Sequence, residues 1–355
     1  MIQQLQDVQA AVGAEFEANM HSTPVSFGND SSAIQAARLG VALCDRSHWG
    51  RIQVADEDRI RFLHNQSTND FQRLAPGQGC DTVMVTSTAR TIDLVTAYLM
   101  EECVLLLVSP NRRQYLMDWL DRYIFFSDKV KLTDVTGESA TFSLIGPESD
   151  AILDRIGASA IIGQSYATHQ LVQLGDTEVR VAVGSGLAMP GYTLILKTEN
   201  AATVWSNIIQ AGAVPLGDRA WEQLRIEQGR PAPDQELTED YNPLEVGLWQ
   251  TISFDKGCYI GQETIARLNT YKGVKQCLWG IRLSAPVTPG SVITVGDEKV
   301  GSITSYTDTD RGAFGLGYIR TKAGGVGLKV QIGDTKGEIV EVPFLTYLQR
   351  QEGSH

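Results

Sequence analysis

The stretch Lys256–Glu263 of this 355-residue chain reads KGCYIGQE. It holds one cysteine, Cys258, between Gly257 and Gly261, with a lysine two positions before the thiol. Glycine permits backbone conformations that other residues avoid, and it lets a ligand approach the main chain closely. A nearby ammonium group favours the thiolate, which is the nucleophilic and metal-binding form of cysteine. The stretch therefore predicts a reactive thiol in an exposed loop, with a buried cysteine in a tight turn as the alternative.

The residues after this loop predict a helix. Gln262 and Glu263 would occupy its first turn, where amide and acidic side chains complement the helix dipole and the free N–H groups. Cys258 would then lie just ahead of the positive end of the helix, which also favours the thiolate. Lys256 is the residue expected to tune the pKa of this thiol.

The same eight residues resemble the signature of the YgfZ-type proteins, which are folate-dependent factors in iron–sulfur cluster assembly and repair. Those proteins are relatives of the glycine-cleavage T-protein, the aminomethyltransferase, and this chain looks closest to their cyanobacterial and chloroplast branch. Further stretches similar to T-proteins are Asp45–Gly50, Phe62–Asp70 and Val300–Ser305. The resemblance extends from about Phe27 to Tyr347. It implies an α+β fold, a three-lobed cloverleaf around a central folate site with a small β-barrel as the C-terminal lobe.

Composition limits the partners of this chain. The net charge is −12 and the sequence pI is about 4.9, which disfavours nucleic acid and anionic membranes, because these bind clustered Lys and Arg. A local basic pocket remains compatible with this charge. The opening stretch carries no basic residue before Arg38, unlike a signal or transit peptide. Apolar runs such as Val104–Val108 are too short to cross a bilayer. We expect a soluble protein of the cytoplasm, or of the chloroplast stroma if the source bears plastids.

Five cysteines are scattered along the chain, and no two of them form a Cys-x-x-Cys pair. The odd count and wide spacing argue against a disulfide framework and against a preformed zinc or iron–sulfur site. His48 and His64 have no partner at metal-ligand spacing, so we expect no metal site. A chain of this kind would serve an iron–sulfur cluster without storing one.

Apolar periodicity predicts mixed helices and strands before residue 270. Residues 1–25 are expected to form an N-terminal helix that packs onto the body, because apolar residues recur there at three- and four-residue steps. Residues 26–270 are expected to form two α+β lobes, the second of which runs from Lys131 to about Ala213. Helices are predicted at 56–71, 110–123, 148–156 and 201–211. Strands are predicted at 51–54, 82–87, 91–100, 104–108, 140–145, 178–183 and 192–196.

The pattern changes beyond Gly273. Short alternating strands separated by turns are predicted at 278–283, 291–295, 301–307 and 315–319, with no long helix between them. Close and even strand spacing is typical of a small barrel or sandwich. We therefore expect a separate C-terminal β-barrel over residues 274–350.

Asp93 is an acid within the otherwise apolar run Thr91–Val95. A buried carboxylate is costly unless it is paired or bound to a ligand, so the alternative is an edge-strand aspartate that faces water. T-proteins carry Gly-Gly-Ile-x-Asp-Asp at this place, and Asp93 matches the first aspartate of the pair. The resemblance implies that Asp93 accepts a hydrogen bond from the pterin ring of tetrahydrofolate.

Four further residues are assigned to the folate site by the resemblance. Arg225 lies in a stretch similar to the T-protein Leu-Arg-Leu-Glu-Ala-Gly, and a guanidinium suits the carboxylates of the folate tail. Glu245 matches the acid of Pro-x-Glu-x-Gly-Leu. Tyr192 and Tyr259 would also contact the ligand. The alternatives are a structural salt bridge for Arg225 and a capping acid at a helix start for Glu245.

Two departures from the T-protein pattern bear on function. Acids follow Gly-Tyr-Thr in T-proteins, whereas Leu194 and Ile195 follow Thr193 here. The T-protein Lys-x-Asp-Phe-Ile-Gly becomes a stretch with Cys258 in place of the aspartate, which favours redox or sulfur chemistry.

The resulting hypothesis is a tetrahydrofolate-dependent accessory protein for iron–sulfur client or assembly proteins, with Cys258 and Lys256 as its working residues. The alternatives are an aminomethyltransferase and a folate-binding protein without chemistry.

Overall fold

The computed structural model describes residues 2–17 and 22–347 and separates the chain into two compact units. Unit 1 consists of Met1–Phe62, Gln72–Asp81 and Val95–Glu222. Unit 2 consists of Leu63–Phe71, Thr82–Leu94 and Gln223–His355. The predicted N-terminal segment 1–25 includes residues 1 and 18–21, and the predicted barrel 274–350 includes residues 348–350, all outside the described residues.

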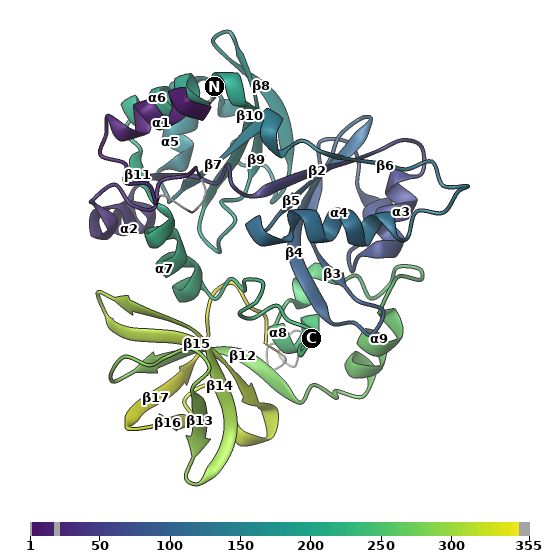
Figure 1. Ribbon diagram of the computed structural model, residues 1–355, viewed down its shortest axis with the longest axis vertical. Coiled ribbons are helices and arrows are strands. Elements are labelled where there is room, and N and C mark those ends of the chain that lie inside the picture. The colour runs from purple at the N-terminus through teal and green to yellow at the C-terminus, as the bar shows by residue number, and fades with distance from the viewer. Residues whose placement is uncertain (1, 18–21, 348–355) are drawn as a thin grey trace. The chain divides into compact units, whose positions relative to one another are not determined.

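A six-stranded sheet forms the core of unit 1 (Figure 1). Its central strands β7 and β10 are almost wholly buried, and β1 pairs with β7 antiparallel and with β11 in parallel. The buried apolar side chains of β7 and β10 include Phe142, Leu144, Leu194 and Leu196, as expected for strands covered by helices. The order of the strands is β11 (Val214–Leu216), β1 (Ala42–Asp45), β7 (Ser139–Ile145), β10 (Gly191–Lys197), β9 (Thr177–Val183) and β8 (His169–Leu174).

A five-stranded sheet contains the strands predicted near residues 50–108. Its order is β3 (Gly79–Val85), β4 (Thr91–Leu99), β5 (Cys103–Val108), β2 (Gly50–Ala55) and β6 (Lys131–Asp134). The second predicted lobe begins at Lys131, yet β6 pairs with β2 of the first. Strand β1 likewise belongs to the other sheet, although β2 follows it closely in the chain. The sequence predicted neither β1 nor β6 as strands, and it gave no sign of these exchanges, because pairing partners far apart in sequence leave no local signal.

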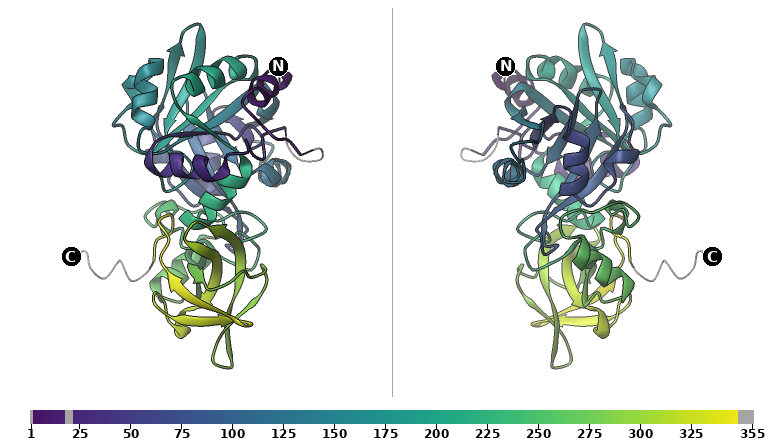
Figure 2. Two further views of the ribbon diagram at one scale, coloured as in Figure 1. Left: turned by 90° about the vertical axis from the view of Figure 1, so that its left-hand side faces the viewer. Right: turned by 90° about the vertical axis from the view of Figure 1, so that its right-hand side faces the viewer.

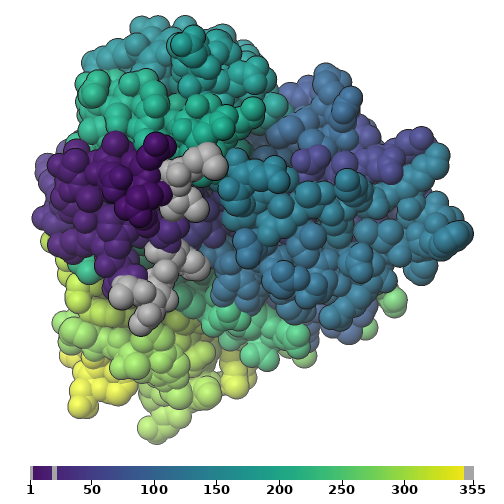
Figure 3. Space-filling model, turned by 45° about the horizontal axis from the view of Figure 1, so that its top comes forward, coloured from purple at the N-terminus to yellow at the C-terminus, as the bar shows by residue number. Residues whose placement is uncertain are grey.

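The N-terminal helix α1 spans Ile2–Ala10 and packs on α6 (Ala201–Gln210). Figure 3 shows the purple N-terminal segment against the teal-green surface of unit 1. The buried Gln9 donates from Nε2 to Asp45 Oδ2 at 2.8 Å, which fixes the helix to β1. The predicted docking of the helix is confirmed, but the helix ends before Val12 and Phe16, which are exposed.

The remaining helices cover the sheets or connect them. The predicted helices over 148–156 and 201–211 are confirmed. The helix predicted over 56–71 is shorter in the structure, where α3 spans Arg59–Gln66. Helices α2 and α7 were not predicted from the sequence. Helix α5 ends at Gly157, whose left-handed φ of 87° suits a glycine C-cap. The other helices are α2 (Asp30–Leu39), α3 (Arg59–Gln66), α4 (Arg113–Asp121), α5 (Ser149–Ile156), α7 (Asp218–Gln228), α8 (Pro243–Val246) and α9 (Gln262–Thr270).

The C-terminal region is a closed six-stranded barrel, seen from two sides in Figure 2. Its order is β12 (Gln276–Leu283), β15 (Gly312–Arg320), β14 (Glu298–Thr309), β13 (Val292–Val295), β16 (Lys329–Ile332) and β17 (Thr335–Val340), with β17 pairing back to β12. The predicted barrel is therefore confirmed. Its last two strands, β16 and β17, were not predicted from the sequence.

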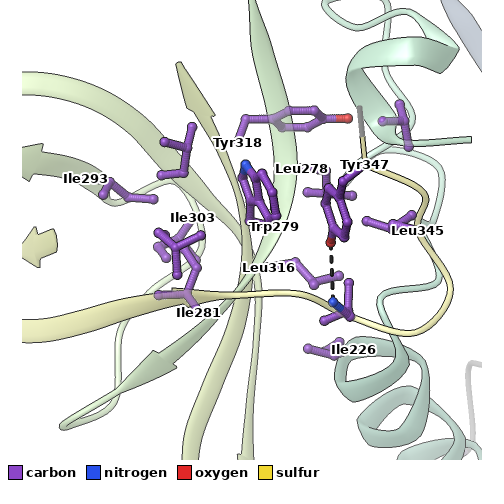
Figure 4. Close-up of a cluster of buried hydrophobic side chains, with 14 of the residues drawn as sticks. Ile226, Leu278, Trp279, Ile281, Ile293, Ile303, Leu316, Tyr318, Leu345 and Tyr347 are labelled. Carbon is purple, nitrogen blue, oxygen red and sulfur yellow. Dashed lines mark hydrogen bonds between the residues drawn. The ribbon is translucent and has the colours of Figure 1, made fainter. Parts of the chain in front are cut away.

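Large apolar side chains fill the barrel (Figure 4). The rings of Trp279 and Tyr347 are stacked with centroids 4.0 Å apart, and Ile281, Ile303 and Leu316 are fully or almost fully buried. A β-carbon on Gly301 would lie 1.9 Å from the carbonyl oxygen of Tyr318, so this position in β14 requires glycine.

Candidate functional site

Cys258 lies in the loop before α9 and is exposed to solvent. The other four cysteines are buried or half-buried. Burial raises the pKa of the thiols of Cys44, Cys103 and Cys277, the last to about 11. Cys258 is therefore the most exposed of the five thiols, and the predicted exposed loop is confirmed.

Lys256 is buried and anchors the start of this loop. Its Nζ donates to the backbone carbonyl oxygens of His64, Ser67 and Asn69 at 2.5, 2.8 and 2.6 Å. These oxygens lie at and just beyond the C-terminal end of α3, where helix carbonyls have no partner within the helix. The ammonium group also lies 4.6 Å from the ring centroid of Tyr259. These contacts give Lys256 a structural role, and its effect on Cys258 stays a prediction.

The end of the loop is fixed by a glycine. Gly261 has a φ of 78°, and a β-carbon there would lie 2.9 Å from the carbonyl oxygen of Thr86 and 3.0 Å from Cα of Ala89. Ile260 N–H donates to the carbonyl oxygen of Asn65 at 2.9 Å. Helix α9 starts at the next residue, as predicted. Only glycine combines this φ with so close an approach.

His64 is the imidazole beside the loop. A β-carbon on Gly257 would lie 3.9 Å from its Nε2, and its Nδ1 lies 3.2 Å from Asp70 Oδ1. Burial, followed by the charge of Lys256, lowers the pKa of His64 below its usual value. The ring is therefore neutral near pH 7 and able to accept a proton. From the sequence, His64 was interpreted as a structural histidine, because a lone histidine is more often structural than catalytic, and its contact with Asp70 was not predicted.

Asp93 is completely buried on β4. The alternative of an edge-strand aspartate that faces water is therefore wrong. The structure withholds this carboxylate from water, and its contact with a pterin ring stays a prediction.

Arg225 and Glu236 form a buried ion pair. Arg225 Nη1 lies 3.0 Å from Glu236 Oε2, and the two side chains are 4% and 0% exposed. The guanidinium also donates to the carbonyl oxygen of Arg230 at 3.1 Å, to Ser305 Oγ at 3.0 Å and to Gln235. These contacts match the structural alternative for Arg225. A role with the folate tail stays a prediction.

Glu245 belongs to a capping box at the start of α8. The side chain of Asn242 accepts from the backbone N–H groups of Leu244 and Glu245, and Glu245 Oε2 accepts from Asn242 N–H at 3.2 Å. Burial raises the pKa of this carboxyl group above its usual value. The capping role that the sequence left open is observed.

The two tyrosines are buried. Tyr192 lies in unit 1, where its hydroxyl donates to Asp150 Oδ1 at 2.6 Å, and burial raises its pKa. Tyr259 lies in unit 2 within an apolar cluster that includes Ala89 and Val274, and burial raises its pKa to about 12. Asp93, Arg225, Glu245 and Cys258 also belong to unit 2, so Tyr192 is the one predicted residue in the other unit.

Asp45 and Arg46 begin the T-protein-like stretch at the end of β1. They form a polar cluster in unit 1 with Thr23 and Asp218. Asp218 Oδ2 accepts a hydrogen bond from Thr23 Oγ1 at 3.0 Å. Burial raises the pKa of Asp218 to about 7, and the negative charge of Asp45 adds to this rise. The hydrogen bond from Thr23 and the positive charge of Arg46 lower the pKa and offset part of the rise.

We expect Asp218→Asn to stabilise the protein at high pH. The folded state holds the Asp218 proton more tightly than the unfolded state, so the stability that protonation contributes is complete below pH about 4 and is lost as pH rises to about 7. Asparagine mimics the protonated form at every pH. Between pH 5 and 8 the variant should gain roughly 2 kcal/mol in free energy of unfolding relative to the parent. Urea unfolding at pH 5 and pH 8 measures this gain, with the exposed Asp297→Asn as the control variant. If the free energies of unfolding of the parent and Asp218→Asn changed equally between the two pH values, the prediction would be contradicted.

Within residues 2–17 and 22–347, no helix is long and apolar enough to cross a membrane. The same residues contain no group of three His, Cys, Asp or Glu side chains that could hold a metal ion.

Comparison with known proteins identifies the family of this chain and several similar proteins. Residues 5–256 match the family described as GCVT N-terminal domain. A chloroplastic protein of Arabidopsis thaliana, named as a transferase without a stated substrate, is 49% identical over 323 residues, which cover 90% of this chain and 75% of that protein. The aminomethyltransferase of Geobacillus kaustophilus is 29% identical over 339 residues, which cover 90% of this chain and 92% of the relative.

The crystal structure of the glycine cleavage system aminomethyltransferase T from Bartonella henselae superposes with a TM-score of 0.84. The match covers 96% of this chain and 97% of that one at 19% identity, and it confirms the predicted fold. The chain belongs to the GCVT N-terminal domain family, in the folate-related superfamily of T-protein-type transferases.

Proposed function

We propose that the protein is a tetrahydrofolate-dependent accessory factor for the assembly or repair of iron–sulfur proteins, with the thiol of Cys258 as its working group. The observation that carries this proposal is the exposure of Cys258, among five cysteines, on a loop anchored at both ends. Lys256 fixes one end by donating hydrogen bonds to three carbonyl oxygens. Gly261 fixes the other end, directly before α9, where its backbone lies close to Thr86 and Ala89. An exposed thiol on an ordered loop can meet a partner without a rearrangement of the backbone.

The surroundings of the loop suit thiol chemistry. Cys258 precedes the N-terminal end of α9, whose free N–H groups favour negative charge nearby. His64, neutral near pH 7 and oriented by Asp70, is the base available at this loop. Cys258 would act on a client or assembly protein as a thiolate or as a transient ligand.

Asp93 is the residue that would hold the pterin, because its fully buried carboxylate can accept hydrogen bonds from ring N–H groups. Arg225, Tyr192 and Glu245 are the other nominated residues, and each has a hydrogen-bond or ion-pair partner within the protein. Tetrahydrofolate, when bound, supplies the one-carbon chemistry. Membership of a folate-related superfamily supports its binding here.

An aminomethyltransferase activity is the second candidate. The bacterial relative at 29% identity bears that name, and Asp93 is retained as a buried acid. The thiol of Cys258 in place of an acid favours the accessory role. We propose that the protein works in the cytoplasm or, in a plastid-bearing source, in the chloroplast stroma, and the chloroplastic relative supports the latter. Its partners are folate and iron–sulfur proteins, not nucleic acid or membranes.

Cys258→Ser should abolish function while leaving the fold intact, because the side chain is exposed. The measurement is complementation of a cell that lacks its own YgfZ-type protein, scored by the activity of an iron–sulfur enzyme. Cys103→Ser, which changes a half-buried thiol, is the matched control and should complement. Calorimetric titration with tetrahydrofolate should show saturable binding to Cys258→Ser and weaker binding to Asp93→Ala.

Full complementation by Cys258→Ser would contradict the role of the thiol. If the parent failed to bind tetrahydrofolate, the folate part of the proposal would be wrong. If both the parent and Cys258→Ser transferred the one-carbon unit of a carrier-bound aminomethyl group to tetrahydrofolate, with release of ammonia, the result would instead support the aminomethyltransferase.

A further inference from the structure

Unit 2 contains a recess of about 790 Å³ whose lining includes one residue discussed above, Glu245, which caps the start of α8. Four separate chain segments line it: the turn before β4, the start of α8, the segment that leads into β12, and the end of β15 with the turn after it. The charged side chains among them are Arg90, Asp240, Glu245, Lys275, Arg320 and Lys322. We call this cavity the cationic recess.

Its charge is opposite to that of the whole chain. Four cationic and two acidic side chains line it, for a local balance of +2, whereas the chain carries −12. Clusters of one sign in a concave site focus the electrostatic field and concentrate counter-ions there. The segments are far apart in sequence, so no run of basic residues announces the recess. Its charge arises only from the fold.

The backbone holds the recess in shape. Arg90 Nη1 donates to the carbonyl oxygen of Asp240 at 2.9 Å, which positions the guanidinium. Thr321 N–H donates to the carbonyl oxygen of Lys275, and Thr321 Oγ1 to that of Val274, each at 2.9 Å. The entry to β12 is thereby tied to the end of β15. A ligand would therefore meet cations that are already arranged.

The cations on the barrel side are available to a ligand. Arg320 and Lys322 lie 3.6 and 3.4 Å from Glu298 Oε1, but all three side chains are about half exposed or more. Such surface pairs contribute roughly 1 kcal/mol or less, so an anion can compete for them. Glu245, in contrast, is committed to Asn242 N–H and to Gln276. Asp240 and Glu245 offset part of the positive charge, and the four basic side chains leave the recess with its balance of +2.

We propose that the cationic recess binds a small anion that carries at least two phosphate or carboxylate groups. The volume lies within the range of small-molecule sites, and arginine with lysine is the usual combination for phosphate and carboxylate. The recess adjoins the working loop, because Val274 on its wall and Tyr259 share one apolar cluster. The ligand is a second one, in addition to the proposed folate.

Calorimetric titration of the full chain with pyrophosphate and, separately, with citrate tests this proposal without folate. The parent should bind one or both saturably. Lys275→Gln combined with Lys322→Gln removes two exposed cations of the recess and should weaken binding by about tenfold. The matched control combines Lys299→Gln with Lys336→Gln, two exposed barrel lysines outside the recess, and should change affinity by less than about twofold. Preference for one probe identifies the acidic group.

Absence of saturable binding of both probes to the parent would overturn the proposal. Equal weakening by the two double variants would overturn it as well, because net charge and not the recess would then govern binding. Circular dichroism checks that both variants fold. Because neither Cys258 nor folate enters the measurement, its outcome leaves the proposed function to be judged separately.

Discussion

Arg225→Met should lower the free energy of unfolding by about 3–5 kcal/mol, the largest stability effect that we expect. Methionine retains most of the side-chain volume but removes the charge that Glu236 faces at 3.0 Å. Glu236 is 0% exposed, so its carboxylate would be left in a low-dielectric interior without its cation. Ser305 and the carbonyl oxygen of Arg230 would lose a donor in the same change. Urea unfolding measures the loss.

The double variant Arg225→Met with Glu236→Gln is the informative control. It removes both charges, so part of the lost stability should return, and the difference between single and double variants measures the coupling of the pair. Tetrahydrofolate titration of the same proteins separates the two roles of Arg225. Unchanged stability together with lost folate affinity would contradict the structural role and support contact with the folate tail.

Lys256→Met should lower the free energy of unfolding by about 3 kcal/mol. The change removes the donor that lies within 2.8 Å of three carbonyl oxygens and leaves those oxygens in a buried place. It also removes the cation beside the ring of Tyr259. The end of α3 and the start of the Cys258 loop should loosen together, so the thiol should also react faster with iodoacetamide after the anchor is lost.

Lys299→Met is the matched control, because Lys299 is exposed on the barrel, and it should change stability by less than about 0.5 kcal/mol. A catalytic role for Lys256 makes a different prediction, namely unchanged stability with slower alkylation of Cys258 through loss of a nearby positive charge. Normal unfolding combined with slow alkylation would therefore contradict the anchoring role.

Some properties of the predicted site residues depend on neighbouring residues in the sequence, and others depend on contacts with residues far along the chain. The exposure of Cys258 follows from the glycines around it, and the start of α9 follows from the residues in its first turn, so both were predicted correctly. The partners of Lys256 and Arg225 were not, because His64 and Ser305 lie far from them in sequence. A basic residue beside a thiol or in a folate-like stretch gives no indication of buried acceptors elsewhere in the chain.

By itself the sequence determined the class of fold, the positions of most strands, the barrel beyond Gly273 and the loop that holds Cys258. These depend on residue periodicity, turn residues and one dense motif, all of which are local. Only the tertiary structure decided that β1 and β6 pair outside their predicted lobes, that Lys256 and Arg225 are committed to buried partners, and that four distant cations form one recess. Strand pairing, burial and electrostatic potential sum over residues that the chain brings together only on folding, which is why they could not be read from the sequence.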